Sequence, residues 1–132
     1  IIFVASLSDY DQKMFEDETT NRMKDSVYLF RDICANPAFA ETPIILFLNK
    51  RDLFQKKIRD VRIGGEGCFR DYDGPPNDYA AGVDYFLRYF LKQNRDPDRK
   101  VFHHVTCATD TANVQVVMDS TRAMIIQDSL NF

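Results

Sequence analysis

The fold is decided by the stretch IILFLNKRD, residues 44–52. Five consecutive apolar residues predict a buried strand, and a polar tetrad, Asn49 to Asp52, follows that strand at once. In open α/β sheets, ligands bind at the carboxyl ends of the strands. The tetrad therefore stands where a ligand is expected.

Two more short apolar runs occur, at Ile1 to Ser6 and at Lys100 to Thr106, while the run before the tetrad begins at Pro43. Each run is followed by a segment of helical period, which is the alternation of a parallel sheet built from β-then-α units. Three strands with three helices cannot cover both faces and both edges of such a sheet. We therefore expect an α/β fold, a partial doubly wound parallel sheet of about three strands with flanking helices.

The expected helices carry apolar stripes whose ordinary meaning is core packing. The second helix is expected to begin near Asp78, the third is preceded by Asp110 or Thr111 as a capping residue, and residues 63–77 form one long turn-rich loop. The stripes consist of Met23, Val27, Phe30 and Cys34; Tyr79, Val83, Phe86, Leu87 and Phe90; and Val114, Val117, Met118, Thr121 and Ile125.

The composition is that of one globular domain, with 132 residues of which 45% are hydrophobic and 13% aromatic. A net charge of -3 supplies no basic field, which argues against nucleic acid as a partner. No apolar run can span a bilayer and no signal sequence opens the chain, so we expect a soluble, intracellular protein with reduced cysteines. An apolar run at the start and a helical pattern at the end lead us to expect truncation at both ends.

Asp52 can distinguish guanine from adenine. Its carboxylate can accept hydrogen bonds from N1–H and the exocyclic N2 amino group of guanine, and adenine does not present this pair of donors. A mismatched base would leave the carboxylate unpaired. Asn49 can brace the base and the neighbouring loops, and the aliphatic stem of Lys50 can lie over one face of the ring. The alternative is a strand end that starts a helix, with Asp52 as the N-cap.

A second loop favours the base-binding interpretation. The sequence after the third expected strand is TCAT, residues 106–109, in which the backbone N–H of Ala108 can meet guanine O6. The pattern N-K-x-D alone arises by chance in roughly one or two of a hundred chains of this length. Two such loops, each at the end of an apolar strand and in this order, are much rarer by accident.

The chain resembles the heterotrimeric G-protein alpha subunits over nearly its whole length. The segments that carry the resemblance are SDYD at 8–11, NRM at 21–23, IILFLNKRDLF at 44–54 and TCATDTANV at 106–114. The resemblance implies that residues 1–132 are the C-terminal part of one Ras-like GTPase domain of the P-loop NTPase class. It also implies a guanine pocket formed by Asn49, Lys50, Asp52, Cys107, Ala108 and Thr109.

The same resemblance implies cofactors and partners. GTP and GDP would be the ligands, with Mg²⁺ in the intact protein, whose function would be a GTP-hydrolysing switch for G-protein-coupled receptor signals. Residues 8–21 would form a nucleotide-sensitive loop, and the helix 113–130 would receive the receptor. The beta-gamma dimer and an effector would be further partners. The intact protein would lie at the cytoplasmic face of the plasma membrane, attached through an N-terminal region that is missing here.

The chain also departs from the family. No G-x-x-x-x-G-K-[ST] phosphate loop occurs, and Asp71 to Gly74 fits the D-x-x-G pattern but follows the tetrad instead of preceding it. The arginine and glutamine that handle the transferred phosphoryl group have no counterpart. We therefore assign no catalytic residue and no metal ligand, and we expect that these 132 residues alone hydrolyse no GTP.

Other sites receive less support from the sequence. A calcium loop at Asp9, Asp11 and 16–18 lacks a third ligand position and the central glycine. His103 and His104 are adjacent in a strand and would point to opposite faces, so both cannot grip one metal ion. Cys107 as a hydrolase nucleophile has no orienting third group. A non-enzymatic interaction module that has lost nucleotide binding remains the rival function, and the upstream coding sequence would decide between the two.

Overall fold

The computed structural model describes residues 1–15, 19–65 and 67–107, together with the single positions 115, 118, 119, 122 and 123. Three parallel strands form one sheet in the order β1 (Ile2–Ser6), β2 (Ile44–Asn49) and β3 (Val101–Val105). In the register, Leu46 of β2 pairs with Phe3 of β1 and with His103 of β3. The partial parallel sheet expected from the sequence is confirmed, and β2 is its central strand.

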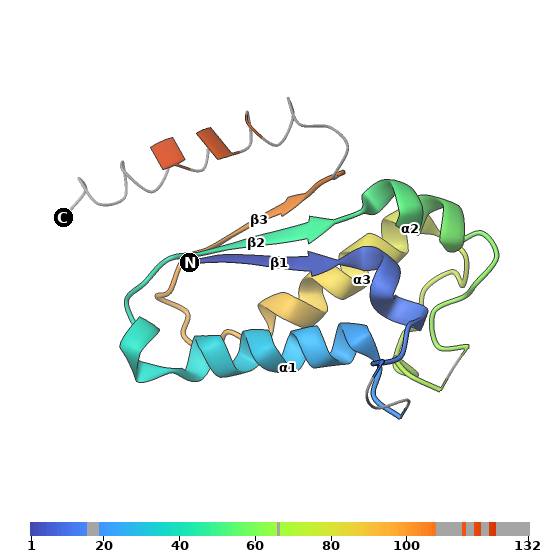
Figure 1. Cartoon of the computed structure of the whole chain (residues 1–132), viewed down its shortest axis with the longest axis horizontal. Helices are drawn as coiled ribbons and strands as arrows, with labels where there is room; N and C mark the ends of the chain where they lie inside the picture. Colours follow the sequence, from blue (N-terminus) through green and yellow to red (C-terminus); the bar gives the residue numbers. More distant parts are fainter. Residues whose placement is uncertain (16–18, 66, 108–114, 116–117, 120–121, 124–132) are drawn as a thin grey trace.

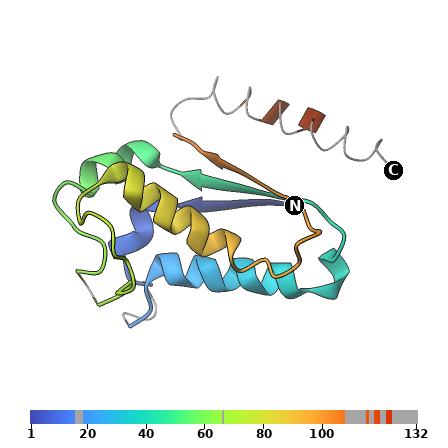
Figure 2. The same ribbon diagram turned by 180° about the vertical axis from the view of Figure 1, so that it is seen from behind.

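Within residues 1–107, apart from the gaps, three α-helices accompany the sheet. They are α1 (Arg22–Ala35), α2 (Arg51–Lys57) and α3 (Tyr79–Leu91), with the short 3₁₀ helices η1 (Leu7–Asp11) and η2 (Pro37–Phe39) between the larger elements. Both long helices cover the same face of the sheet, as the two opposite views show (Figure 1, Figure 2). Among the described residues, no helix has the length and apolar character that crossing a membrane requires.

The covered face is closed by aromatic side chains from three elements. The ring of Phe3 in β1 lies 5.2 Å from the ring of Phe30 in α1 and 6.2 Å from that of Phe90 in α3. The rings of Phe30 and Phe90 are in turn 5.7 Å apart and nearly perpendicular, which is a favourable edge-to-face geometry. These contacts fix α1 and α3 against β1 and place the core between the helices and the sheet.

Local sequence explains where the helices begin. The side chain of Asn21 accepts a hydrogen bond from the backbone N–H of Lys24 and caps α1, and Asp78 does the same for α3 by accepting from Ala81. The first two apolar stripes are buried or half-buried, as expected from the sequence. Of the third stripe, Met118 is described, in a helical conformation and half-buried. The other members of that stripe and its two capping candidates lie outside the described residues.

Candidate functional site

The segments that follow β2 and β3 meet at one edge of the sheet. The backbone N–H of Thr106 donates to the carbonyl oxygen of Leu48 at 2.9 Å, and the N–H of Arg51 donates to the carbonyl oxygen of Thr106 at 3.1 Å. Because Thr106 follows the last residue of β3 and Arg51 follows β2, these bonds continue the strand pairing into the two loops. The loops that were expected to bind the base are therefore held together by backbone hydrogen bonds.

Asn49 ties the turn between β2 and α2 to the β3 loop. Its Oδ1 accepts from the backbone N–H of Lys50 at 2.8 Å and from the hydroxyl of Thr106 at 3.4 Å. These bonds join the turn at Lys50 to the loop that begins at Thr106, and contact of Asn49 with a base stays a prediction. The sequence motif contains Thr106 but gives no indication of its role. Thr106 is buried, and its hydroxyl holds the oxygen of Asn49 on the neighbouring strand.

Lys50 adopts a left-handed backbone conformation, with φ 60° and ψ 39°. This conformation costs free energy in a residue that has a Cβ, and such residues concentrate at functional sites. It turns the chain sharply from β2 into α2, so that α2 begins at Arg51. The side chain of Lys50 is exposed, as a side chain covering a ligand must be before the ligand binds.

The N-cap alternative for Asp52 is wrong, because Lys50 occupies the N-cap position and Asp52 lies in the first turn of α2. A hydrogen bond from the thiol of Cys107 holds the pKa of the Asp52 carboxyl below its usual range. Partial burial opposes this effect on the pKa, whereas the backbone N–H of Leu53 and the charge of Lys56 support it. Asp52 is therefore an ionised hydrogen-bond acceptor at the start of a helix, where negative charge is also favoured by the helix dipole.

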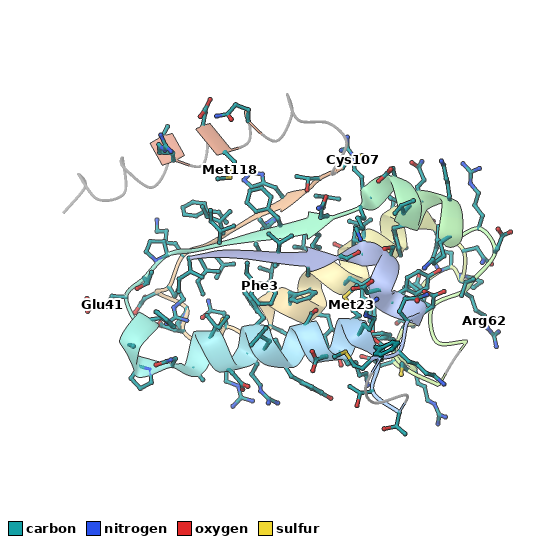
Figure 3. The ribbon with its side chains drawn as sticks, in the orientation of Figure 1. Phe3, Met23, Glu41, Arg62, Cys107 and Met118 are labelled. Carbon is teal, nitrogen blue, oxygen red and sulfur yellow. The ribbon has the colours of Figure 1, made fainter. Side chains whose placement is uncertain are left out.

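Cys107 links the second loop to this carboxylate. The residue follows β3 and lies close to the beginning of α2 (Figure 3). Its thiol donates a hydrogen bond to the Asp52 carboxylate. The arrangement therefore suits a positioning role better than the hydrolase role considered for Cys107. Ala108 and Thr109 lie outside the described residues, so their assignment to the pocket stays a prediction.

The structure brings together four of the six predicted pocket residues, namely Asn49, Lys50, Asp52 and Cys107. They share the carboxyl edge of the sheet, and each is fixed by a backbone turn, a hydrogen bond or both. The arrangement offers one ionised acceptor, one amide and one long cationic side chain to a planar ligand. A base with two adjacent donors on one edge fits such a set.

The metal-binding alternatives find no support in the described part of the chain, where no group of three histidine, cysteine, aspartate or glutamate side chains is placed to hold an ion. The carboxylate of Asp11 lies 2.9 Å from Nζ of Lys57. His103 is exposed, while His104 packs its ring 5.7 Å from that of Phe47. Residues 16–18 of the acidic loop lie outside the described residues.

One hollow in the described surface lies away from this edge. Its volume is about 460 Å³, and it is found where α1 and α3 end, which is the amino edge of the sheet. Its lining residues are Arg31, Cys34, Ala35, Gln93, Arg95 and Asp96. A flat base can be held at a shallow edge by well-placed polar groups, and such groups lie at the carboxyl edge of the sheet and not in this hollow.

Comparison with known proteins agrees with the geometry. A family model of the G-protein alpha subunit matches residues 1–125. The guanine nucleotide-binding protein alpha-17 subunit of Caenorhabditis elegans is 47% identical over 131 residues, which are 98% of this chain and 36% of that protein. The alpha-3 subunit of the same organism is 47% identical over 130 residues, with the same two coverages. The chain thus spans 36% of the length of these relatives, and because the family model matches nearly all of it, the chain belongs to the G-protein alpha subunit family.

Proposed function

We propose that this chain supplies the guanine-recognition part of a GTP-binding and GTP-hydrolysing switch. One observation carries the proposal. The ionised carboxylate of Asp52 lies at the carboxyl edge of the parallel strands β2 and β3, in contact with Cys107 in the loop that follows β3. Ligands bind at this edge in open α/β sheets. Membership of the G-protein alpha subunit family supports the same ligand class.

In the proposed complex, N1–H and the N2 amino group of guanine donate to the two oxygens of Asp52. The Cys107 thiol then either donates to the carboxylate together with guanine or is displaced from it by guanine. Asn49 keeps the turn and the second loop in register, and the stem of Lys50 covers one face of the ring. The backbone N–H of Ala108 would meet guanine O6, and Thr109 would complete the loop.

The activity of the whole protein is part of the proposal. Residues 1–132 would be the C-terminal part of one Ras-like GTPase domain, and the groups that bind the phosphates and Mg²⁺ and catalyse hydrolysis would come from other parts of the intact protein. Partners would be a beta-gamma dimer, a G-protein-coupled receptor and an effector. The intact protein would act at the cytoplasmic face of the plasma membrane.

The test is a change of base preference. In the full-length protein, Asp52→Asn exchanges one acceptor oxygen for a donor amide, so affinity for GDP should fall by about a hundredfold. XDP should bind better than it does to wild type, because xanthine has an oxygen where guanine has its amino group. Equilibrium titration with both nucleotides measures the preference.

Asp60→Asn is the matched control, since Asp60 is an exposed aspartate shortly after α2. It should leave both affinities unchanged. A preference for GDP that persists in Asp52→Asn would contradict the assignment of Asp52. A wild-type protein that binds neither nucleotide would favour the interaction module that has lost its ligand.

A further inference from the structure

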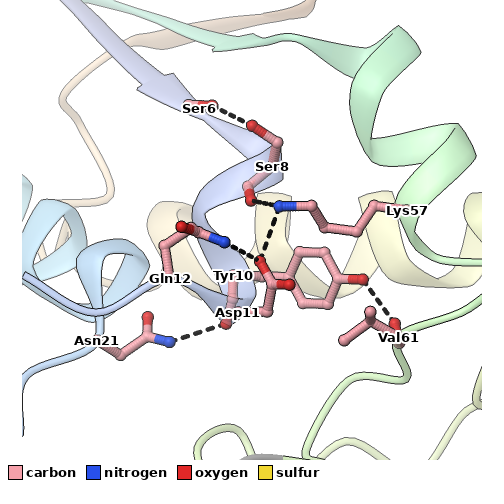
Figure 4. A network of polar contacts seen from close by, with 8 residues as sticks. All are labelled: Ser6, Ser8, Tyr10, Asp11, Gln12, Asn21, Lys57 and Val61. Carbon is pink, nitrogen blue, oxygen red and sulfur yellow. Dashed lines mark hydrogen bonds and ion pairs between the residues drawn. The ribbon is translucent and has the colours of Figure 1, made fainter.

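The far end of α2 is tied to the turn that follows β1. Nζ of Lys57, the last residue of α2, donates to the carbonyl oxygen of Ser8 and to Oδ1 of Asp11, both at 2.9 Å (Figure 4). The side chains are only 27% and 13% exposed for Lys57 and Asp11. A partly buried ion pair with a second hydrogen bond is less screened by solvent than a surface pair. This contact therefore joins α2 to η1 with a defined geometry.

Tyr10 makes a second connection between the same two elements. Its ring is buried and meets the ring of Phe54 in α2 at 5.3 Å, nearly at a right angle. Its hydroxyl donates to the carbonyl oxygen of Val61 at 2.5 Å, just beyond the end of α2. Polar and apolar contacts thus hold η1 against the same side of α2.

The other side of η1 is fixed to α1. The side-chain amide of Asn21 donates to the carbonyl oxygen of Tyr10 at 2.8 Å, while its oxygen caps α1. The backbone N–H of Arg22 donates to the carbonyl oxygen of Gln12 at 2.8 Å. η1 consequently stands between α1 and α2, with hydrogen bonds to residues at the start of α1 and the end of α2.

α2 is short, and both of its ends are held. Asp52 in its first turn contacts Cys107, and Lys57 in its last turn contacts η1. Five residues of α-helix rise by about 7.5 Å, a length over which a helix moves as a rigid body. A rigid α2 would carry a displacement of Lys57 to the carboxylate of Asp52.

We propose that Lys57 is a positioning residue for the guanine site, and that its pairing with Asp11 makes guanine affinity depend on the conformation of the segment that begins at Ser8. The inference rests on the proposed function, because it assigns a role in base recognition to a residue that does not touch the base. Lys57 acts through α2 on Asp52. The Asp11 carboxylate also accepts from Nε2 of Gln12 at 3.0 Å, so its own position is restricted.

The first experiment measures GDP and XDP affinities of full-length Lys57→Met. Methionine keeps an unbranched stem near the ring of Tyr10 but has no hydrogen to donate to Ser8 or Asp11. We expect GDP affinity to fall by about five- to tenfold, in the usual range of coupling between sites. XDP affinity should change less, because Asp52 does not attract xanthine, so the preference for GDP should shrink.

Arg88→Met is the matched control. Arg88 pairs with Asp84 at 3.0 Å, but both side chains are exposed and belong to α3, so this ion pair joins no two elements. Its loss should leave both affinities unchanged. Lys57→Arg, which keeps the charge and the donors, should retain most of the GDP affinity.

The second experiment separates positioning from a general loss of structure. Asp11→Asn should mimic Lys57→Met, and the double variant should lose little more than either single variant. In the Asp52→Asn background, Lys57→Met should change GDP affinity by less than about twofold, since the group it positions is already altered. If Lys57→Met does not fold, as judged by its thermal melt, Asp11→Asn and Lys57→Arg carry the same comparison.

The outcomes distinguish this inference from the proposed function. A wild-type protein without preference for GDP would refute the proposed function itself. A wild-type preference that survives unchanged in both Lys57→Met and Asp11→Asn would overturn only the role of Lys57. Equal losses for GDP and XDP would show that Lys57 is merely structural and would also overturn the inference.

Discussion

Strands β1 and β2 lie side by side, and both are rich in apolar residues, but their environments differ. Ile2 and Val4 of β1 are 53% and 59% exposed, whereas Ile45 and Phe47, their partners in the register, are 7% and 5% exposed. All four side chains alternate onto the same face of the sheet. Exposure on this face is thus set by the place of a strand in the sheet and not by residue type.

The difference also separates two roles. β2, buried on both faces and paired on both sides, ends directly in Asn49 and the left-handed turn at Lys50. β1, which within the described residues pairs on one side only, ends in η1 and its contacts with Lys57. The central strand therefore fixes the candidate site, and the strand beside it leads to the segment that braces the site from the far end of α2.

The largest expected effect comes from removing a side chain of β2. Leu46 is fully buried in the core, so Leu46→Ala should lower the free energy of unfolding by about 2–5 kcal/mol. Val4→Ala in β1, which lacks a packed environment, should cost about 0.5 kcal/mol or less. Urea unfolding of both variants measures the two losses. Similar losses would show that the environments of the strands differ less than their exposures indicate.

A smaller loss of stability is expected from a substitution at Gly82, where α3 packs against Phe54 of α2. A Cβ at Gly82 would lie 2.9 Å from Cζ of Phe54 and 3.2 Å from Cδ1 of Ile63, and both of these side chains are buried. Alanine gains up to about 1 kcal/mol of helix propensity over glycine, but overpacking a core costs about 1–3 kcal/mol. Gly82→Ala should therefore destabilise the protein by about 1 kcal/mol, measured by the same unfolding transition.

Gly65→Ala serves as the control for Gly82→Ala. There the nearest neighbour of the new Cβ is Cγ of Arg62, a side chain that is exposed and able to move. Its effect should stay within about 0.5 kcal/mol. If Gly82→Ala were neutral or stabilising, the side chains of Phe54 and Ile63 would be able to move aside for the added methyl group, contrary to the close packing inferred here.

Much of the fold could be predicted because it follows from local patterns. The three apolar runs are the three strands within one or two residues, and the cap at Asp78 and the stripe from Met23 to Phe30 are as the periodicity indicates. The sequence suggests α2 only as the helix start that is the alternative to base binding. With seven residues it is too short to show an apolar period, and its start depends on the backbone conformation of Lys50.

The sequence suggests candidate members of the site but not the contacts between them. The motif N-K-x-D makes Asn49, Lys50 and Asp52 candidates because their chemistry matches a base edge. No local pattern indicates that Cys107 contacts Asp52, or that Lys57 reaches Asp11 across 46 residues. Such contacts depend on how separate elements pack, and hydrophobic period alone does not fix which polar groups meet.

The smallest expected effect is a pH dependence of stability at His104. This residue of β3 is the register partner of Phe47, so it lies on the same face of the sheet as Val4 and Phe47 but on the opposite edge strand from Val4. Burial lowers the pKa of His104, and the neighbouring charge of His103 acts in the same direction. The unfolded chain, with an ordinary histidine pKa of about 6.5, then takes up a proton before the folded protein does. Stability should therefore be fully present above about pH 6.5 and should decrease as the pH falls from there through the lowered pKa of the folded state.

Replacing His104 by glutamine should remove this part of the pH dependence. Urea midpoints at pH 7.5 and 5.5 measure it, and wild type should lose slightly more stability between the two than His104→Gln does. His103→Gln is the control, because His103 is exposed and burial is the larger cause of the shift at His104, so most of the slope should remain. Equal slopes in wild type and His104→Gln would mean that the face beside Phe47 is as open to water at β3 as it is at Val4, and the contrast between the strands would then be confined to β2.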